Sequence, residues 1–117
     1  MSLQKHAREL IWSKNGRNYA FQSNFSAFGG DGNDVVWVSA FNHTDNPFMI
    51  FDLMEWSGED EEFFMKYAIS NLKFIDNETV EFSVFRLGEG DNSELHDETA
   101  RYRYDLRKEK MKEVFRR

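Results

Sequence analysis

The sequence predicts a mainly β fold, an antiparallel meander of seven to eight strands that closes into a small barrel or a sandwich, with short helices allowed at the termini. Two observations predict it. Aromatic residues make up 16% of the chain, as 12 Phe, 4 Tyr and 3 Trp, and these side chains suit the half-buried surface of a pleated sheet. Large apolar residues also recur at every second position between segments of turn-forming residues.

A chain of 117 residues is expected to form one β-rich domain, 1–117. It contains no Cys, which excludes a disulfide framework and thiolate chemistry. No run of about 20 apolar residues is present to span a membrane, and the N-terminus lacks the apolar stretch of a secretory signal. We therefore expect a cytoplasmic protein without a membrane partner, in which the sequons at Asn24, Asn42 and Asn77 are chance matches.

The first element is expected to be a hairpin centred on Asn15 and Gly16. Asn-Gly is typical of a two-residue type I′ turn, because both central positions need a positive φ. The hairpin would place four large residues on one face, pairing Trp12 with Tyr19 and Leu10 with Phe21. The alternative is a short helix over residues 3–11 that Gly16 terminates.

Strand character continues from this hairpin to residue 27 and breaks at the Gly-rich stretch 29–34, which is predicted to be a loop. The β-branched and aromatic run 35–41 predicts the next strand. A second turn is expected over 42–47 and a further strand over 48–56.

The segment that follows is ambiguous. Ser57 and the acidic residues 59–62 could cap a helix. The alternation of Phe63, Met65, Tyr67 and Ile69 favours a strand instead. We prefer the strand, because the residues that follow have a clear β pattern.

The clearest hairpin surrounds a three-residue loop at residues 76–78. Its register would pair Phe74 with Val80, Leu72 with Phe82 and, on the other face, Lys73 with Glu81. One register therefore satisfies both the apolar and the charged face.

The last third of the chain is expected to contain a strand over 80–87, a loop from 88 to about 98, and an alternating strand over 100–107. Residues 108–117 are helix formers, with a last short strand as the alternative. The expected strand count and order are similar to those of small lipocalin-type barrels. No residue motif carries that likeness, so it implies no family.

The formal net charge of −6 is unevenly distributed. Residues 1–17 carry +3, residues 18–65 carry −9, residues 66–100 carry −5 and residues 101–117 carry +5. The structural interpretation is that the basic ends neutralise the acidic middle within the fold. The functional one is a binding face of one sign. So long an acidic stretch disfavours nucleic acid as the main partner.

The candidate ligand-binding residues are aromatic side chains from different predicted strands: Trp12, Tyr19, Trp37, Trp56, Tyr67 and Tyr102. In a barrel the tryptophans could line an apolar cavity and the tyrosines could offer hydroxyl groups to a ligand. The competing interpretation is that these rings simply fill the core, since a barrel of eight strands can be filled by side chains alone.

Other chemistry has weaker signals. Asp31, Asn33 and Asp34 offer oxygen ligands, but their spacing departs from that of an EF-hand loop. His43 and His96 each have a nearby carboxylate, which is routine for surface loops. The sequence shows no complete metal-ligand set, no cofactor motif and no recognisable nucleophile, so we assign no cofactor, metal or catalytic residue.

Three functions remain open. The first is a non-catalytic binding domain that holds a small apolar ligand or docks a protein partner, with a homodimer allowed. The second is a small acidic inhibitor or immunity-type protein that covers a basic site, for which Glu59–Glu62 would be a docking patch. The third is an enzyme that uses a loop His with a carboxylate.

Overall fold

The computed structural model describes residues 7–23, 35–57, 67–87 and 95–117. These contain one short helix, α1 (Leu53–Trp56), and eight strands: β1 (Ala7–Trp12), β2 (Tyr19–Ser23), β3 (Val35–Ala40), β4 (His43–Asp52), β5 (Tyr67–Asp76), β6 (Thr79–Leu87), β7 (Leu95–Asp105) and β8 (Lys110–Arg116). The mainly β prediction is confirmed. No helix in the described ranges is long and apolar enough to cross a bilayer.

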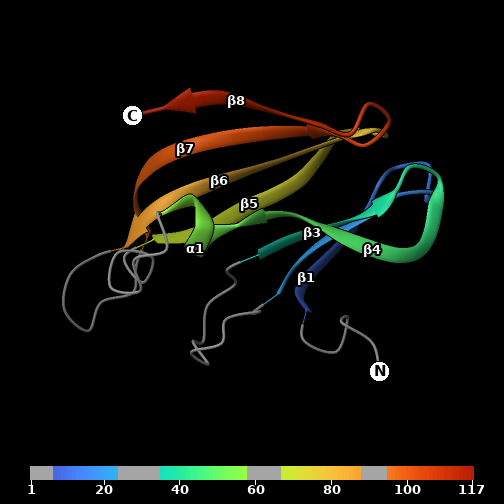
Figure 1. The fold of residues 1–117 in the computed structure, drawn as a ribbon, viewed down its shortest axis with the longest axis horizontal. Coiled ribbons are helices and arrows are strands. Elements are labelled where there is room, and N and C mark those ends of the chain that lie inside the picture. Colours follow the sequence, from blue (N-terminus) through green and yellow to red (C-terminus); the bar gives the residue numbers. More distant parts are fainter. Residues whose placement is uncertain (1–6, 24–34, 58–66, 88–94) are drawn as a thin grey trace.

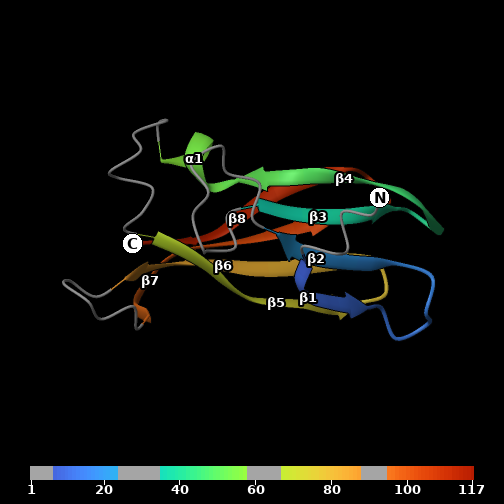
Figure 2. The same cartoon turned by 90° about the horizontal axis from the view of Figure 1, so that it is seen from below.

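The strands form two antiparallel sheets, ordered β1-β2-β3-β4 and β5-β6-β7-β8. Figure 1 shows each sheet as a meander of sequential strands, with β5–β8 above β1–β4, and Figure 2 shows the molecule from below, with β1–β4 in front of the second sheet. Among the described residues, no ladder joins β4 to β5 or β8 to β1. The closed ladder of a barrel is therefore not seen there.

The core lies between the two sheets. Its buried residues alternate along the strands: Ala20, Val36 and Val38 come from the first sheet, and Val80, Phe82, Val84, Ala100, Tyr102 and Tyr104 come from the second. Rings meet across the layers, with 4.9 Å between the centroids of Phe51 and Phe82 and 6.4 Å between those of Phe48 and Tyr104. Aromatic residues thus supply much of the contact between the sheets.

The register of the first hairpin is confirmed, since Trp12 lies opposite Tyr19 and Leu10 opposite Phe21. The type I′ turn is wrong. Gly16 has a φ of 73°, but Asn15 is not among the residues with positive φ. The backbone N–H of Gly16 instead donates to the carbonyl of Ser13 at 2.9 Å. The side chain of Asn15 stabilises this wider turn by accepting a bond of 3.0 Å from the N–H of Arg17.

Two predicted pairs of the second hairpin are confirmed, since Phe74 lies opposite Val80 and Lys73 opposite Glu81. The pair of Leu72 with Phe82 is not part of the ladder, and the three-residue loop is wrong, because Asp76 pairs with Thr79. The ladder shifts between Ser70 and Lys73, where Asn71 has a φ of 60°. This irregularity is a β-bulge, and bulges bend and twist a strand at a sheet edge.

The expected turn over 42–47 is too long, because β4 already begins at His43 and includes Pro47. The expected strand over 48–56 is too long as well. Asp52 caps α1 by accepting a bond of 3.0 Å from the N–H of Met54, which turns the last four residues into a helical turn. Of the strand preferred over 63–69, residues 67–69 belong to β5, and the others lie outside the described residues.

The C-terminal helix is wrong, because residues 110–116 form the edge strand β8. The carboxylate of Asp105 accepts bonds from the N–H groups of Arg107 and Lys108, and Glu109 has a φ of 53°. These features reverse the chain onto β7. A bulge then follows in β8, so that Met111 lies opposite Tyr104 but Phe115 opposite Arg101. Met111 and Phe115 therefore lie on opposite faces of the sheet and do not share the single face that a helix would give them.

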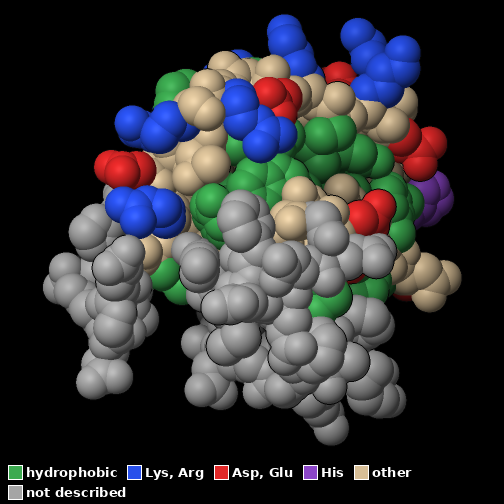
Figure 3. Space-filling model, turned by 60° about the vertical axis from the view of Figure 1, so that its left-hand side comes forward, with side chains coloured by type: hydrophobic (Ala, Val, Ile, Leu, Met, Phe, Trp, Pro, Cys, Tyr) green, Lys and Arg blue, Asp and Glu red, His purple; other side chains and the backbone are tan. Residues whose placement is uncertain are grey.

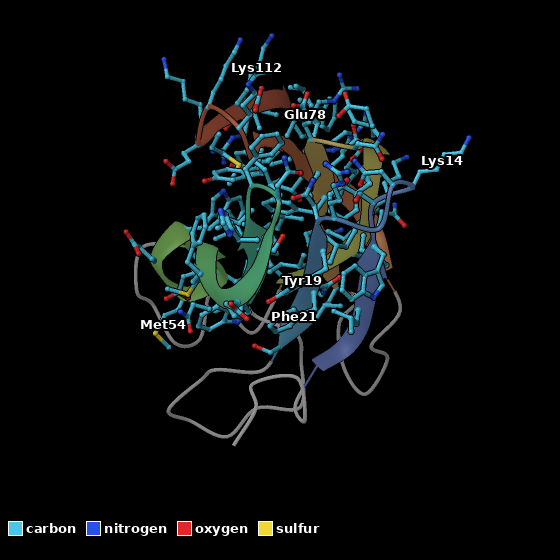
Figure 4. All side chains as sticks on the ribbon, turned by 90° about the vertical axis from the view of Figure 1, so that its right-hand side faces the viewer. Lys14, Tyr19, Phe21, Met54, Glu78 and Lys112 are labelled. Carbon is cyan, nitrogen blue, oxygen red and sulfur yellow. The ribbon has the colours of Figure 1, made fainter. Side chains whose placement is uncertain are left out.

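One end of the molecule is held together by hydrogen bonds between turns. Buried Asn18 donates through its side-chain amide to the carbonyl of Asn77 at 2.7 Å and accepts from the N–H of Asn42 at 2.7 Å. The N–H of Leu106 donates to the carbonyl of Glu78 at 2.8 Å. Four hairpin turns are thereby connected, and Figure 4 views this end of the molecule.

Candidate functional site

A groove of about 430 Å³ lies between the edge strands β1 and β5. One wall is formed by Ile11, Trp12 and Lys14, at the end of β1 and the start of its turn. The other wall is formed by the second half of β5 and its turn, residues 72–77. The volume falls in the usual range of about 300–1,000 Å³ for small-molecule sites.

Apolar side chains of the groove remain open to solvent. Trp12 is 50% exposed and Ile75 is 41% exposed. The rings of Trp12 and Tyr19 pack in a T-shaped arrangement with 5.3 Å between their centroids, so Tyr19 supports the indole. A supported aromatic side chain can contact a ligand at little conformational cost.

The groove is open because its walls are unpaired edges. Among the described residues, β1 pairs only with β2, and β5 pairs only with β6. Beyond the groove, β5 is tied to β2, the neighbour of β1, because the amide of buried Gln22 donates to the carbonyl of Ile69 at 3.0 Å. The other atom of that amide, Oε1, has no donor in the described part of the chain.

The charged residues of the groove are Lys14, Lys73 and Asp76. Lys14 is exposed and forms no ion pair with any described residue. Figure 4 shows its side chain extending outward from the β1–β2 turn. The amine of Lys73 lies 3.4 Å from the carboxylate of Glu81. One oxygen of Asp76 accepts a bond of 2.8 Å from the N–H of Glu78.

The aromatic residues predicted as a ligand site do not form one site. Trp12, Tyr19 and Trp37 belong to the first sheet, on the face opposite the core. Phe21 joins them, because its ring stacks with Trp37 at 6.2 Å and with Tyr19 at 6.2 Å. We call Leu10, Trp12, Tyr19, Phe21, Trp37 and Met49 the outer apolar face, since cross-strand pairing aligns them on the side of the sheet opposite the core. Tyr19 and Phe21 are buried, whereas Leu10, Trp12 and Met49 are exposed. Only Trp12 among the predicted residues also lines the groove.

The other three predicted residues gather beside α1. The indole N–H of Trp56 donates to the hydroxyl of Tyr102 at 2.6 Å, and the rings of Trp56 and Tyr67 lie 5.2 Å apart. The guanidinium of Arg116 lies over the indole at 5.3 Å and donates to the same hydroxyl at 3.2 Å. Burial raises the pKa of Tyr102. This cluster attaches α1 and β8 to β7, and its polar groups already satisfy one another.

Trp56 also borders a smaller pocket of about 230 Å³, together with Ile50, Phe51, Asp52 and Glu55. Its volume lies below the usual range for ligand sites. Asp52 is already committed as the cap of α1. The larger groove is therefore the better candidate.

The outer face of the second sheet carries paired charges. Burial alone would raise the pKa of Glu81, but hydrogen bonds from Arg103 and Lys73 outweigh it and hold that pKa below its ordinary value of 4.5. Hydrogen bonding from Arg101 lowers the pKa of Glu98 in the same way. Basic residues from the C-terminal segment thus neutralise carboxylates of β6 and β7.

Further cations lie along β8 and its turn, where Lys108, Lys110 and Lys112 are exposed. In Figure 3 the Lys and Arg side chains gather along the upper side of the view, where β8 lies in Figure 1.

The remaining sequence candidates include His43, which the structure describes, and several residues that it does not. His43 is exposed at the start of β4 and contacts no carboxylate in the described ranges. His96 falls within β7, but its side chain lies outside what the structure describes. The loop residues Asp31, Asn33 and Asp34 and the acidic segment 59–62 also lie outside the described residues.

The groove includes residues that the sequence reasoning missed. Ile75 could have indicated the groove from the sequence, because it lies two positions after Lys73 and is therefore an apolar residue on the charged face of the hairpin. An apolar residue on the solvent-exposed face of a strand indicates a binding surface when another exposed apolar residue lies next to it. Comparisons with protein-family models, with curated proteins and with solved structures gave no match to this chain.

Proposed function

We propose that this protein is a non-catalytic binding domain that holds a small apolar ligand in the groove between β1 and β5. The observation that carries the proposal is a groove of about 430 Å³ in which Trp12 is 50% exposed. Burying an exposed aromatic side chain against a ligand releases about 25 cal/mol for each Å² of apolar surface. The proposal favours the sandwich over the closed barrel, because the groove requires two unpaired edges.

The test is a titration of the ¹⁵N-labelled protein with decanol, followed by NMR. We expect shifts of the Trp12 indole and of the amides of residues 72–77, and loss of these shifts in Trp12→Ala. Met49→Ala is the matched control, since Met49 is 40% exposed on the outer apolar face and does not line the groove. Equal binding by Trp12→Ala, or shifts confined to other residues, would contradict the proposal.

A second candidate function is docking of a protein partner on the outer apolar face. It is favoured by the exposure of Leu10 (41%) and Met49 (40%) beside Trp12. A second copy of the chain is the first partner to test, by light scattering over a range of concentrations. A homodimer should dissociate in Met49→Glu, because a carboxylate in an apolar interface costs several kcal/mol unless it is paired. A monomer at every concentration would exclude this partner.

A further inference from the structure

We propose that the ligand of the β1–β5 groove carries an anionic group, such as a carboxylate, at the end of an apolar body. This inference rests on the proposed function and names its ligand class. It follows from the two lysines, which come from opposite walls: Lys14 from the β1–β2 turn and Lys73 from β5.

Both lysines are available to a ligand. Lys14 is exposed without an ion pair among the described residues. The side chain of Lys73 is 59% exposed. Its partner Glu81 is held more closely by Arg103, at 2.8 Å against 3.4 Å for Lys73. Glu81 would keep one strong partner if Lys73 turned toward a ligand, so that movement leaves no isolated buried charge.

One carboxylate, that of Asp76, is among the described residues that line the groove. One oxygen of Asp76 accepts the N–H of Glu78 within the β5–β6 turn. Lys14, Lys73 and Arg103 outnumber the carboxylates of Asp76 and Glu81 by one, so the groove and its ion-pair partners are locally positive, although the whole chain carries −6. At physiological ionic strength, charges more than about 8 Å away are largely screened. The nearby lysines therefore dominate the field that a bound anion experiences.

The same groove supplies the apolar contact. Trp12 and Ile75 offer exposed surface, and Leu72 and Phe74 connect the floor to the core. An amphiphile would lie with its chain on these residues and its carboxylate between the two amines. Because Lys carries a long apolar stem below its charge, the lysine stems can also cover the chain.

The experiment compares three ligands with chains of ten carbons, used below their micelle concentrations: decanoate, decanol and decyltrimethylammonium. Dissociation constants are measured by NMR titration of the wild type and of Lys14→Gln, Lys73→Gln and the double variant. Lys112→Gln is the matched control, because Lys112 is an exposed lysine on β8 that does not line the groove.

We expect the wild type to bind decanoate more tightly than decanol and decyltrimethylammonium least. Each groove substitution should weaken decanoate binding by about two- to fivefold, as for an exposed ion pair, and leave decanol binding unchanged. Decanoate affinity should also fall with added salt. Lys112→Gln should bind all three ligands as the wild type does.

Equal affinities for decanoate and decanol, or decanoate binding that neither groove substitution weakens, would overturn the anionic ligand while the binding groove itself stands. If none of the three ligands shifts Trp12 or residues 72–77, the proposed function fails as well. Thermal unfolding of each variant shows whether a lost affinity reflects a lost fold.

Discussion

Asn18 and Asn77 connect the two sheets at their turns, through a hydrogen bond of 2.7 Å that spans 59 positions of the sequence. Asn18 is fully buried. Its side chain also accepts from the N–H of Asn42, and its own N–H donates to the hydroxyl of Ser13 at 3.1 Å. The side-chain amide of Asn18 thus connects its own turn to the β3–β4 and β5–β6 turns, and its backbone N–H fixes it within its own turn.

We predict that Asn18→Ala lowers the free energy of unfolding by about 1–3 kcal/mol, because the N–H of Asn42 and the carbonyl of Asn77 lose their part-buried hydrogen bonds. Urea unfolding followed by circular dichroism measures the change. Lys14→Ala, an exposed change in the same turn, should stay within about 0.5 kcal/mol. A small loss for both variants would mean that water replaces the amide.

Acid should destabilise the protein through Glu81. Burial would raise the pKa of this carboxyl, but its two cationic partners lower it below 4.5. A lowered pKa in the folded state gives stability that is present above the unfolded pKa and is lost as pH falls through the folded value. Glu81→Gln should therefore lose about 1 kcal/mol at pH 7, and its stability should fall less steeply below about pH 4.5.

The control for this pH profile is Glu55→Gln. Glu55 is exposed and has no ion pair among the described residues. If the free energy of unfolding fell equally steeply with falling pH in the wild type and in Glu81→Gln, other carboxylates would be responsible for the acid destabilisation.

Tyr102→Phe should cost about 1–2 kcal/mol, because the indole N–H of Trp56 loses its acceptor. Burial raises the pKa of Tyr102 above 10. A raised folded pKa gives stability that is lost as pH rises through it. Denaturation between about pH 9 and 12 should therefore be less steep in Tyr102→Phe than in the wild type. Conversion of Trp56 to Phe should give a similar loss at pH 7 without changing the number of phenols.

Glu109→Gly should raise stability by about 0.5–1 kcal/mol. Glu109 has a φ of 53°, a left-handed conformation that costs a residue with a Cβ about 1–2 kcal/mol, while glycine also gains freedom in the unfolded chain. Lys108→Gly is the control, since Lys108 is not among the residues with positive φ, and it should be neutral or destabilising. Thermal unfolding distinguishes the two variants, and a loss in Glu109→Gly would contradict the strain.

Local sequence patterns predicted the register of the first hairpin and two pairs of the second, because these registers place apolar residues opposite each other on one face. They did not predict the conformation of either turn. They did not predict the end of β4, where capping by Asp52 overrides the β propensity of residues 53–56. They also failed for β8, where Met111 and Phe115 lie on opposite faces of a bulged strand and not on one face of a helix. In both segments a single residue changes the local structure: Asp52 caps a helix, and one extra residue forms the bulge in β8. The spacing of apolar residues over a longer window does not reveal such a change.

The candidate site was less predictable than the fold. Trp12 was predicted to line an apolar cavity together with the other aromatic residues, whereas the structure places it, half exposed, in the groove between β1 and β5. The aromatic residues separate because Tyr19 and Trp37 face away from the core, whereas Trp56 and Tyr102 meet beside α1. Which strand edges face each other depends on how two sheets stack, and no local pattern encodes that.

The lysines of β8 have a consequence for crowded solutions. An open sheet edge can recruit another copy of itself, and extension by repeated pairing produces fibrils. Lys110 and Lys112 place positive charge on the last strand of the second sheet, so two such edges repel each other when they approach. Acetylation of these two amines would remove that repulsion and make the protein prone to assemble by strand addition.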